Sequence, residues 1–194
     1  MSNDITLKDV WISFLLFVLV GAAIVFFVFG FSSAGYIAAL FDTGSIIRET
    51  AVGAGAGLLS AGVLLALYKW TSLEFPDNQY TALIYSLLQK KYGVVTIAAG
   101  AGISEEFLFR GVLLGVLAYY IESLPALMIV SVIFMLVHVP QYKGSLTAHG
   151  VVLCIGLMLG WLFLLFGTLW APIVAHALYN GLLGSAMKHA LLEK

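Results

Sequence analysis

The chain contains 194 residues with a formal net charge of −1, and 62% of them are hydrophobic whereas only 10% are charged. A soluble domain averages about 45–50% apolar and about 25% charged residues, so this chain has too little polar surface to cover a globule of its own size. The composition predicts an integral membrane protein of the all-α class, a polytopic transmembrane helical bundle with about six spans.

The charge balance and the cysteine content exclude further classes of protein. There is no excess of basic residues to neutralise phosphates, so we expect no nucleic acid among the partners. The single cysteine, Cys154, excludes a disulfide framework and a zinc cluster built on cysteines.

Apolar runs separated by polar breaks predict the positions of the six spans. In chain order they are Val10–Phe31, Ala51–Tyr68, Val94–Ile121, Leu124–His138, Gly150–Phe166 and Ala171–Met187. The first run is longer than the apolar part of a signal peptide and lacks a small-residue cleavage site, so we interpret it as a span.

A short interfacial helix is predicted between the second and third spans. It follows the polar residues Pro76, Asp77 and Asn78, and its apolar residues recur at spacings of three and four, which places them on one face. These apolar residues are Tyr80, Leu83, Ile84, Leu87 and Leu88.

We expect one integral membrane domain over residues 1–194. Residues 1–92 supply two spans and the amphipathic segment, and residues 93–190 supply the core that carries the polar motifs. Three pairs of glycines lie four residues apart, a spacing that lets two helix backbones approach closely in lipid. The pairs are Gly53 and Gly57, Gly111 and Gly115, and Gly156 and Gly160.

The basic residues predict that the N-terminus and the C-terminus both lie in the cytoplasm. In that orientation Arg48 alone faces the outside, Arg110 lies within a span, and all of the lysines face the cytoplasm. The lysines are Lys8, Lys69, Lys90, Lys91, Lys143, Lys188 and Lys194.

Ionisable side chains within spans are costly, and each is therefore a functional hypothesis. Glu106 and Arg110 lie four residues apart, which predicts a salt bridge on one helix face. Glu105 points about 100° away and does not share that partner equally. We therefore assign Glu106 and Arg110 to structural support and Glu105 to chemistry, the alternative being that all three only hold helices together.

Two further clusters contain histidines. His138 ends the fourth span, where a single histidine could equally be an interfacial residue. His176 and Asn180 share one face of the last span and need polar partners on a neighbouring helix, for which Glu105 and His138 are suitable. Glutamate and histidine can activate a water, and histidine and asparagine can stabilise an oxyanion, so these residue types suit peptide hydrolysis.

Together, Glu105-Glu106-x-x-x-Arg110, Phe134-x-x-x-His138 and His176-x-x-x-Asn180 resemble the motifs of the CPBP intramembrane proteases. That family groups the CAAX prenyl endopeptidases with bacteriocin-processing and self-immunity proteins, and is also called the Abi family. The likeness runs from about Ala99 to Gly184 and includes the segment Leu169-Trp170-Ala171-Pro172.

The resemblance implies a role for each motif residue. Glu105 and His138 would activate the attacking water, His176 and Asn180 would form the oxyanion site, and Glu106 and Arg110 would support them. It also implies a membrane-associated or lipidated peptide or protein as substrate, and a location in a bacterial cell membrane.

Members of this family are often called metalloproteases, and Glu105, His138 and His176 could hold Zn²⁺ as a set of two histidines and one carboxylate. The His-Glu-x-x-His motif is absent from the chain, and a water activated by a glutamate needs no metal. We therefore expect that no cofactor is required, with Zn²⁺ as the alternative.

A non-enzymatic membrane protein is the alternative function, either a small transporter or a self-immunity-like binder. Such a protein would use the buried polar cluster as a ligand or proton site. Transporters often contain related halves or broken helices at matching positions, and the sequence contains no such symmetry.

The depths of the motif residues predict an unusual turn. Counting about 20 residues back from Ile121 places Glu105 about one turn inside the cytoplasmic boundary. His176, by contrast, closely follows the external turn Gly167–Trp170. Glu105, His138 and His176 can meet only if that turn is recessed, or if the site lies nearer to the middle of the membrane.

Overall fold

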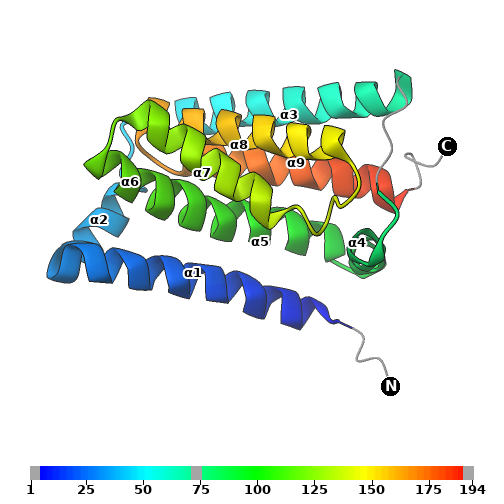
Figure 1. Ribbon diagram of the computed structural model, residues 1–194, viewed down its shortest axis with the longest axis horizontal. Helices are drawn as coiled ribbons and strands as arrows, with labels where there is room; N and C mark the ends of the chain where they lie inside the picture. The colour runs from blue at the N-terminus through cyan, green and yellow to red at the C-terminus, as the bar shows by residue number, and fades with distance from the viewer. Residues whose placement is uncertain (1–4, 71–75, 190–194) are drawn as a thin grey trace.

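The chain forms an all-α bundle, which confirms the predicted fold class. The computed structural model describes residues 5–70 and 76–189, and within these ranges every regular element is a helix (Figure 1). The α-helices are α1 (Leu7–Phe29), α2 (Ser33–Ala39), α3 (Ile46–Trp70), α4 (Gln79–Gln89), α5 (Gly93–Glu106), α6 (Gly115–Tyr120), α7 (Ser123–Val137), α8 (Leu146–Phe166) and α9 (Trp170–Lys188). Lys194 lies outside the described residues.

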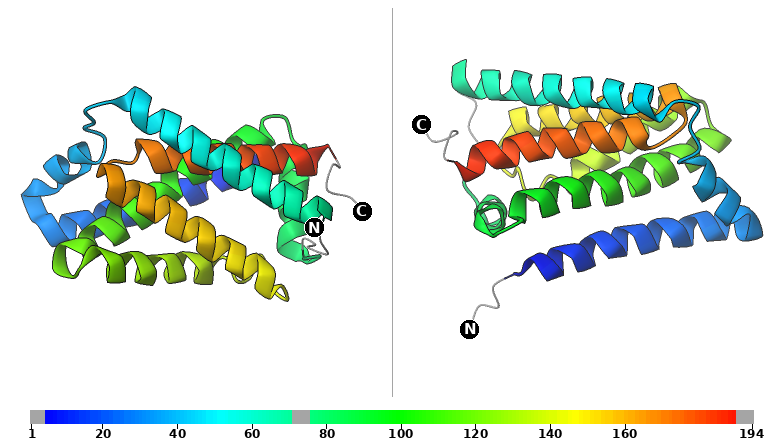
Figure 2. Two further views of the ribbon diagram at one scale, coloured as in Figure 1. Left: turned by 90° about the horizontal axis from the view of Figure 1, so that it is seen from above. Right: turned by 180° about the vertical axis from the view of Figure 1, so that it is seen from behind.

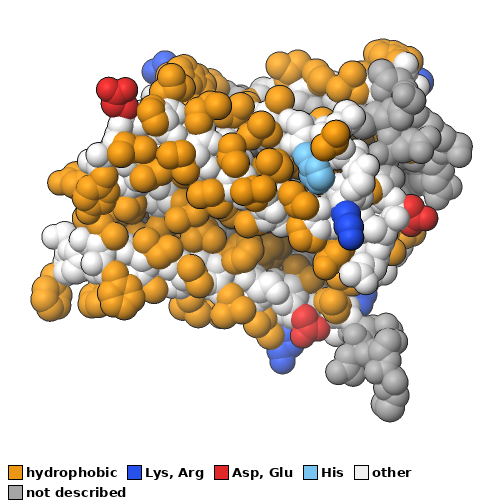
Figure 3. All heavy atoms as spheres, viewed as in Figure 1, with side chains coloured by type: hydrophobic (Ala, Val, Ile, Leu, Met, Phe, Trp, Pro, Cys, Tyr) orange, Lys and Arg blue, Asp and Glu red, His pale blue; other side chains and the backbone are white. Residues whose placement is uncertain are grey.

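The helices are those of an integral membrane protein. Each predicted span overlaps a helix, and three segments are long and apolar enough to cross a membrane on length and composition: Leu7–Ala39, Ile46–Trp70 and Leu146–Phe166. Hydrophobic side chains cover most of the face shown in Figure 3. Helix α5 has only 14 residues, and α9 contains the polar residues His176 and Asn180, so neither is among these three segments.

The first helical segment is longer than the sequence predicts. A turn of 3-10 helix, Gly30–Ser32, follows α1 and leads directly into α2, which the sequence analysis did not anticipate. Gly30 adopts a positive φ of 55°, a conformation that glycine adopts without a steric penalty. This bend directs the chain across one end of the bundle toward the start of α3 (Figure 1).

The predicted interfacial helix is present as α4. The side chain of Asn78 accepts hydrogen bonds from the backbone N–H groups of Tyr80 and Thr81, which caps the helix. Leu87 and Leu88 are buried, and α4 lies across the end of the bundle where both termini are found (Figure 1).

Helix α9 lies between α3 and α5 and approaches both closely (Figure 2). A Cβ atom added to Gly53 would lie 2.3 Å from the carbonyl oxygen of Ala171, and one added to Gly57 would lie 2.5 Å from that of Ala175. On the opposite side of α9, a Cβ atom added to Gly102 of α5 would lie 3.1 Å from the Ile173 carbonyl oxygen. The glycines of α3 therefore allow direct contact between the backbones of α3 and α9, as their spacing predicts.

Helix α7 is short because the residues that follow it do not favour a helix. It ends at Val137, and His138 is its C-terminal capping residue. Pro140 follows two residues later, and the residue before a proline disfavours helical backbone angles. His138 is thereby held at the end of a helix, where the chain turns toward α8.

A π-helical segment, Phe107–Leu114, connects α5 to α6 and contains Arg110. The wide turns of a π-helix often occur at functional sites. The hydroxyl of Tyr36 in α2 donates a 2.6 Å hydrogen bond to the carbonyl oxygen of Gly111 in this segment. The wide turn is therefore supported from a neighbouring helix.

Candidate active site

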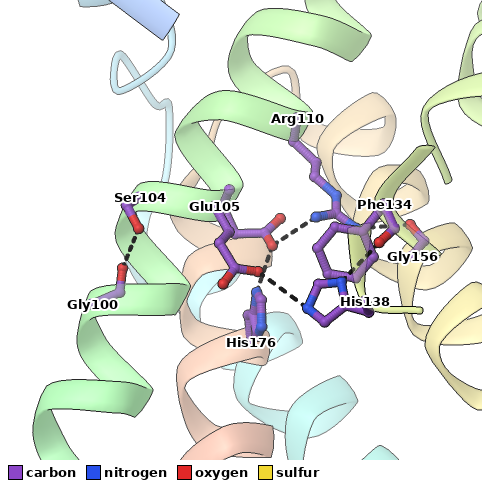
Figure 4. A network of polar contacts seen from close by, with 9 residues as sticks. Gly100, Ser104, Glu105, Arg110, Phe134, His138, Gly156 and His176 are labelled. Atoms are coloured by element: carbon purple, nitrogen blue, oxygen red, sulfur yellow. Dashed lines mark hydrogen bonds and ion pairs between the residues drawn. The ribbon is translucent and has the colours of Figure 1, made fainter. Parts of the chain in front are cut away.

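The side chains of Arg110 and His176 belong to one polar network (Figure 4). Glu106 contacts both of them, and the three residues form a buried polar cluster, here called the buried triad. The Oε1 atom of Glu106 accepts a 2.9 Å hydrogen bond from Nη1 of Arg110, and it lies 2.6 Å from Nδ1 of His176. The side chains of Glu106 and Arg110 are 0% and 1% exposed. The predicted salt bridge between Glu106 and Arg110 is therefore confirmed.

The partner of His176 differs from the sequence expectation. The sequence analysis paired His176 with Glu105 and His138, whereas the structure pairs it with Glu106. The close approach of α9 to α5 at Gly102 brings His176 opposite the face that carries Glu106. Since Oε1 of Glu106 is an acceptor, Nδ1 of His176 must carry the proton in this contact.

Phe134 contacts both the buried triad and His138. The guanidinium carbon of Arg110 lies 4.2 Å from the centroid of its ring, which is a cation–π contact. Its carbonyl oxygen lies 2.8 Å from Nδ1 of His138 and accepts a hydrogen bond from it. The second donor group of Arg110, Nη2, binds the carbonyl oxygen of Gly156 on α8 at 3.1 Å. Three helices thus converge on one guanidinium.

Glu105 and His138 form a second, more accessible group, here called the open pair. Oε2 of Glu105 lies 3.9 Å from Nε2 of His138, and the side chains are 13% and 20% exposed. This distance is too long for a direct hydrogen bond. Since Nδ1–H of His138 is donated to Phe134, the neutral imidazole presents an acceptor at Nε2. Two acceptors therefore face each other, and a water molecule can donate a hydrogen bond to each.

One cavity of about 270 Å³ brings the proposed catalytic residues together. Glu105, His138, His176 and Asn180 all line it, while Glu106 and Arg110 lie behind its wall. The remaining wall is mainly apolar, with side chains from the start of α1, from α4 and from the end of α9. Among them are Val10, Phe14, Ile84, Leu87, Leu88 and Met187. The cavity therefore combines a polar end with an apolar arm.

Two tyrosines that line the cavity were not assigned a role from the sequence. Tyr142, in the segment between α7 and α8, and Tyr179, directly before Asn180, both contribute to the wall. Burial, together with the nearby Glu105 carboxylate, raises the pKa of Tyr142 to about 12. The Tyr142 hydroxyl therefore remains protonated at neutral pH. Its spacing of four from His138 is the signal in the sequence that could have identified it.

The site lies well inside the helix that carries it. Glu105 is twelve residues, or about 18 Å, beyond the start of α5 at Gly93. The turn before α9 is also enclosed, because Thr168 is 4% exposed and Leu169 is fully buried. Glu105 thus lies far from the start of α5, whereas the depth of the Gly167–Trp170 turn in a membrane stays a prediction.

The proposed zinc ligands do not form a metal-binding group in the described part of the chain. There, no three His, Cys, Asp or Glu side chains are arranged to hold a metal ion together. His176 directs Nδ1 to Glu106, so that only its Nε2 is available to another partner. The expectation that no cofactor is required stays a prediction.

Comparison with known proteins gives one match. The family model described as type II CAAX prenyl endopeptidase, Rce1-like, matches residues 87–182, about half of the chain. No curated protein and no solved structure matches the chain. The matched segment begins in α4 and extends into α9, so it contains the buried triad and the open pair. The chain belongs to the Rce1-like family of CAAX-type intramembrane endopeptidases.

Proposed function

We propose that this protein hydrolyses a peptide bond of a membrane-associated or lipidated peptide or protein, with a water activated by Glu105 and His138. The observation that carries the proposal is that Glu105, His138, His176 and Asn180 line one cavity although they come from α5, from the end of α7 and from α9. A scaffold that only packed helices together would not need an open carboxylate beside this cavity.

The open pair supplies the nucleophile. A water between Oε2 of Glu105 and Nε2 of His138 donates a hydrogen bond to each. As the water oxygen adds to the scissile carbonyl carbon, Glu105 accepts one of its protons as a general base. When the C–N bond breaks, the same proton passes from Glu105 to the leaving amine. The products are a carboxylic acid and an amine, and transfer of the remaining acid proton to the amine gives a carboxylate and an ammonium group.

His176 and Asn180 stabilise the charge on the carbonyl oxygen. The Asn180 amide has N–H donors, whereas His176 already uses its Nδ1 proton for Glu106. His176 therefore acts as an oxyanion donor through Nε2 in its imidazolium form, whose charge the Glu106 carboxylate offsets. Arg110 in turn holds that carboxylate in place. The buried triad thus orients and charges a donor of the oxyanion site.

The cavity indicates what kind of substrate would bind. Its polar end accommodates the scissile peptide bond, and its apolar arm between α1, α4 and α9 accommodates an apolar side chain or a lipid. We place both termini and this arm at the cytoplasmic side of a bacterial membrane, because the lysines then lie inside. The non-enzymatic alternative, a transporter or a self-immunity-like binder, would use the same cavity for a bound ligand.

The test uses the purified full chain in nanodiscs and a fluorogenic peptide library in prenylated and unmodified forms. We expect cleavage by the parent protein and by Glu122→Gln, a matched change at an exposed glutamate. Glu105→Gln and His138→Gln should cleave at least about 100-fold more slowly. Turnover by Glu105→Gln at the parent rate would overturn the proposed role of Glu105, and absence of cleavage by the parent protein would favour the non-enzymatic alternative.

The metal-independent mechanism needs its own measurement. Activity should persist after treatment with a chelator and dialysis, because the proposed water is activated by a carboxylate and an imidazole. Loss of activity on chelation, restored by added Zn²⁺, would instead support the zinc alternative with Glu105, His138 and His176 as ligands.

A further inference from the structure

Glu49 is a buried acid that the proposed mechanism does not use. It lies in the first turn of α3, at the end of the bundle opposite to α4, and is only 6% exposed. One carboxylate oxygen accepts a hydrogen bond from the hydroxyl of Thr43, and the other accepts one from the hydroxyl of Thr168. Thr168 belongs to the turn that leads into α9.

The start of α9 depends on such external contacts. The N-terminal capping residue of α9 is Leu169, and no side chain makes a capping hydrogen bond there. Instead, the backbone N–H of Leu169 donates a 2.8 Å hydrogen bond to the carbonyl oxygen of Leu40. The indole Nε1 of Trp170 donates a 3.0 Å hydrogen bond to the carbonyl oxygen of Phe41. Every contact named here comes from the segment between α2 and the first turn of α3.

Helix α3 also contacts α9 beyond the first turn of α9. Backbone contacts at Gly53 and Gly57 leave no room for α9 to move closer to α3. These contacts set the distance between the two helices, whereas the hydrogen bonds at the start of α9 act along its axis. The polar contacts of Thr168 with Glu49 oppose sliding of α9 along α3, because a hydrogen bond to a buried carboxylate is directional and costly to break.

We infer that Glu49 and Thr168 are positioning residues that set the axial position of α9 and thereby the placement of His176 and Asn180 in the site. His176 follows Thr168 by eight residues, which is about 12 Å along a helix. Because a helix is rigid along its axis, fixing the first turn of α9 also fixes the axial position of His176 and Asn180. The inference rests on the proposed function for its catalytic consequence, but its structural consequence can be measured without a substrate.

The test compares three single substitutions. Thr168→Val keeps the shape of the side chain but removes the hydroxyl, and Thr168→Ser keeps the hydroxyl. Thr50→Val is the control, because the Thr50 hydroxyl binds only carbonyl oxygens of its own helix and lies outside the site. We expect Thr168→Val to lower kcat about 10- to 100-fold, with KM changed less than about twofold, since a displacement of about 1 Å can have such an effect. Thr168→Ser and Thr50→Val should retain the parent kcat.

A second readout is independent of catalysis. The chain contains four histidines, so the ring nitrogens of His176 can be assigned in ¹⁵N spectra by comparison with His176→Gln. Thr168→Val should move the His176 Nδ1 resonance away from its hydrogen-bonded position, whereas Thr168→Ser and Thr50→Val should not. If no variant cleaves peptides, the proposed function fails and this shift still tests the inference.

Two results would overturn the inference. One is an unchanged His176 resonance and an unchanged kcat in Thr168→Val. The other is a loss of kcat in Thr168→Val that Thr168→Ser does not restore, which would indicate a general packing effect rather than a hydrogen bond to Glu49.

Discussion

The buried triad and the open pair contain two carboxylates that are neighbours in the sequence but have opposite surroundings. Glu106 is fully enclosed and shares one oxygen between a guanidinium and an imidazole. Glu105 lines the cavity, and its Oε2 lies 3.9 Å from Nε2 of His138, too far for a direct hydrogen bond. A rotation of about 100° along one helix is thus enough to separate a structural acid from a proposed reactive one. Substitutions in the two groups should consequently affect different measurable quantities.

The largest effect on activity is expected in the open pair. Glu105→Gln keeps the size of the side chain and removes the base, so kcat should fall by about 10² to 10⁴-fold, the usual contribution of general acid–base catalysis. The unfolding free energy should stay close to that of the parent, because Glu105 lacks a buried ionic partner at hydrogen-bond distance. Denaturation by SDS in mixed micelles would measure it. A large drop in stability would remove the distinction between the two groups.

The largest effect on stability is expected in the buried triad. Arg110→Met leaves the Glu106 carboxylate buried with only His176 as a partner, and the loss of one member of a buried ion pair costs about 3–5 kcal/mol. The same denaturation assay would detect this as a lower unfolding midpoint. Arg48→Met, at an exposed arginine, is the control and should shift the midpoint little. Equal midpoints for both variants would contradict the structural role of the triad.

Asn180 tests the cavity side of α9 without disturbing the triad. Asn180→Leu removes the amide donor while His176 keeps its contact with Glu106, so kcat should fall by about 10² to 10³-fold, the effect of losing one oxyanion donor. KM should change much less, because the donor acts on charge that develops in the transition state. A raised KM with an unchanged kcat would assign Asn180 to substrate binding instead.

The smallest expected effect concerns the apolar arm. The ring of Phe14 on α1 lies over Gly100, where an added Cβ atom would come within 2.1 Å of it. Phe14→Ala enlarges this part of the cavity. It should raise kcat/KM for substrates with a longer apolar group, compared with substrates that have a shorter apolar group, by less than about 100-fold. Phe27→Ala, at an 86% exposed residue of the same helix, should not change this preference.

The features that depend on local pattern could be predicted from the sequence. Spacings of four residues predicted the Glu106–Arg110 salt bridge and the close contact at Gly53 and Gly57, and an amphipathic spacing predicted α4. These features hold because helical periodicity alone determines which side chains share a face. The motif residues of the candidate site also converge on one cavity, as their types suggested.

The features that depend on how helices are placed could not be predicted in this way. The partner of His176 is set by the approach of α9 to α5, and the span before α2 continues through a bend at Gly30. The π-helical segment also changes the helical phase, so that a regular helical wheel misplaces the faces of α6, which follows it. The role of Glu49 was missed because its partner, Thr168, is 119 residues away.

The position of Phe134 has a consequence for proton exchange with solvent. Its ring covers the guanidinium of Arg110, whereas its carbonyl oxygen binds an imidazole that opens onto the cavity. The labile hydrogens of the Arg110 guanidinium, whose side chain is 1% exposed, should therefore exchange with water slowly. The Nδ1 hydrogen of His138, whose side chain is 20% exposed, should exchange faster. A single aromatic residue thus separates slowly exchanging protons from rapidly exchanging ones within one polar network.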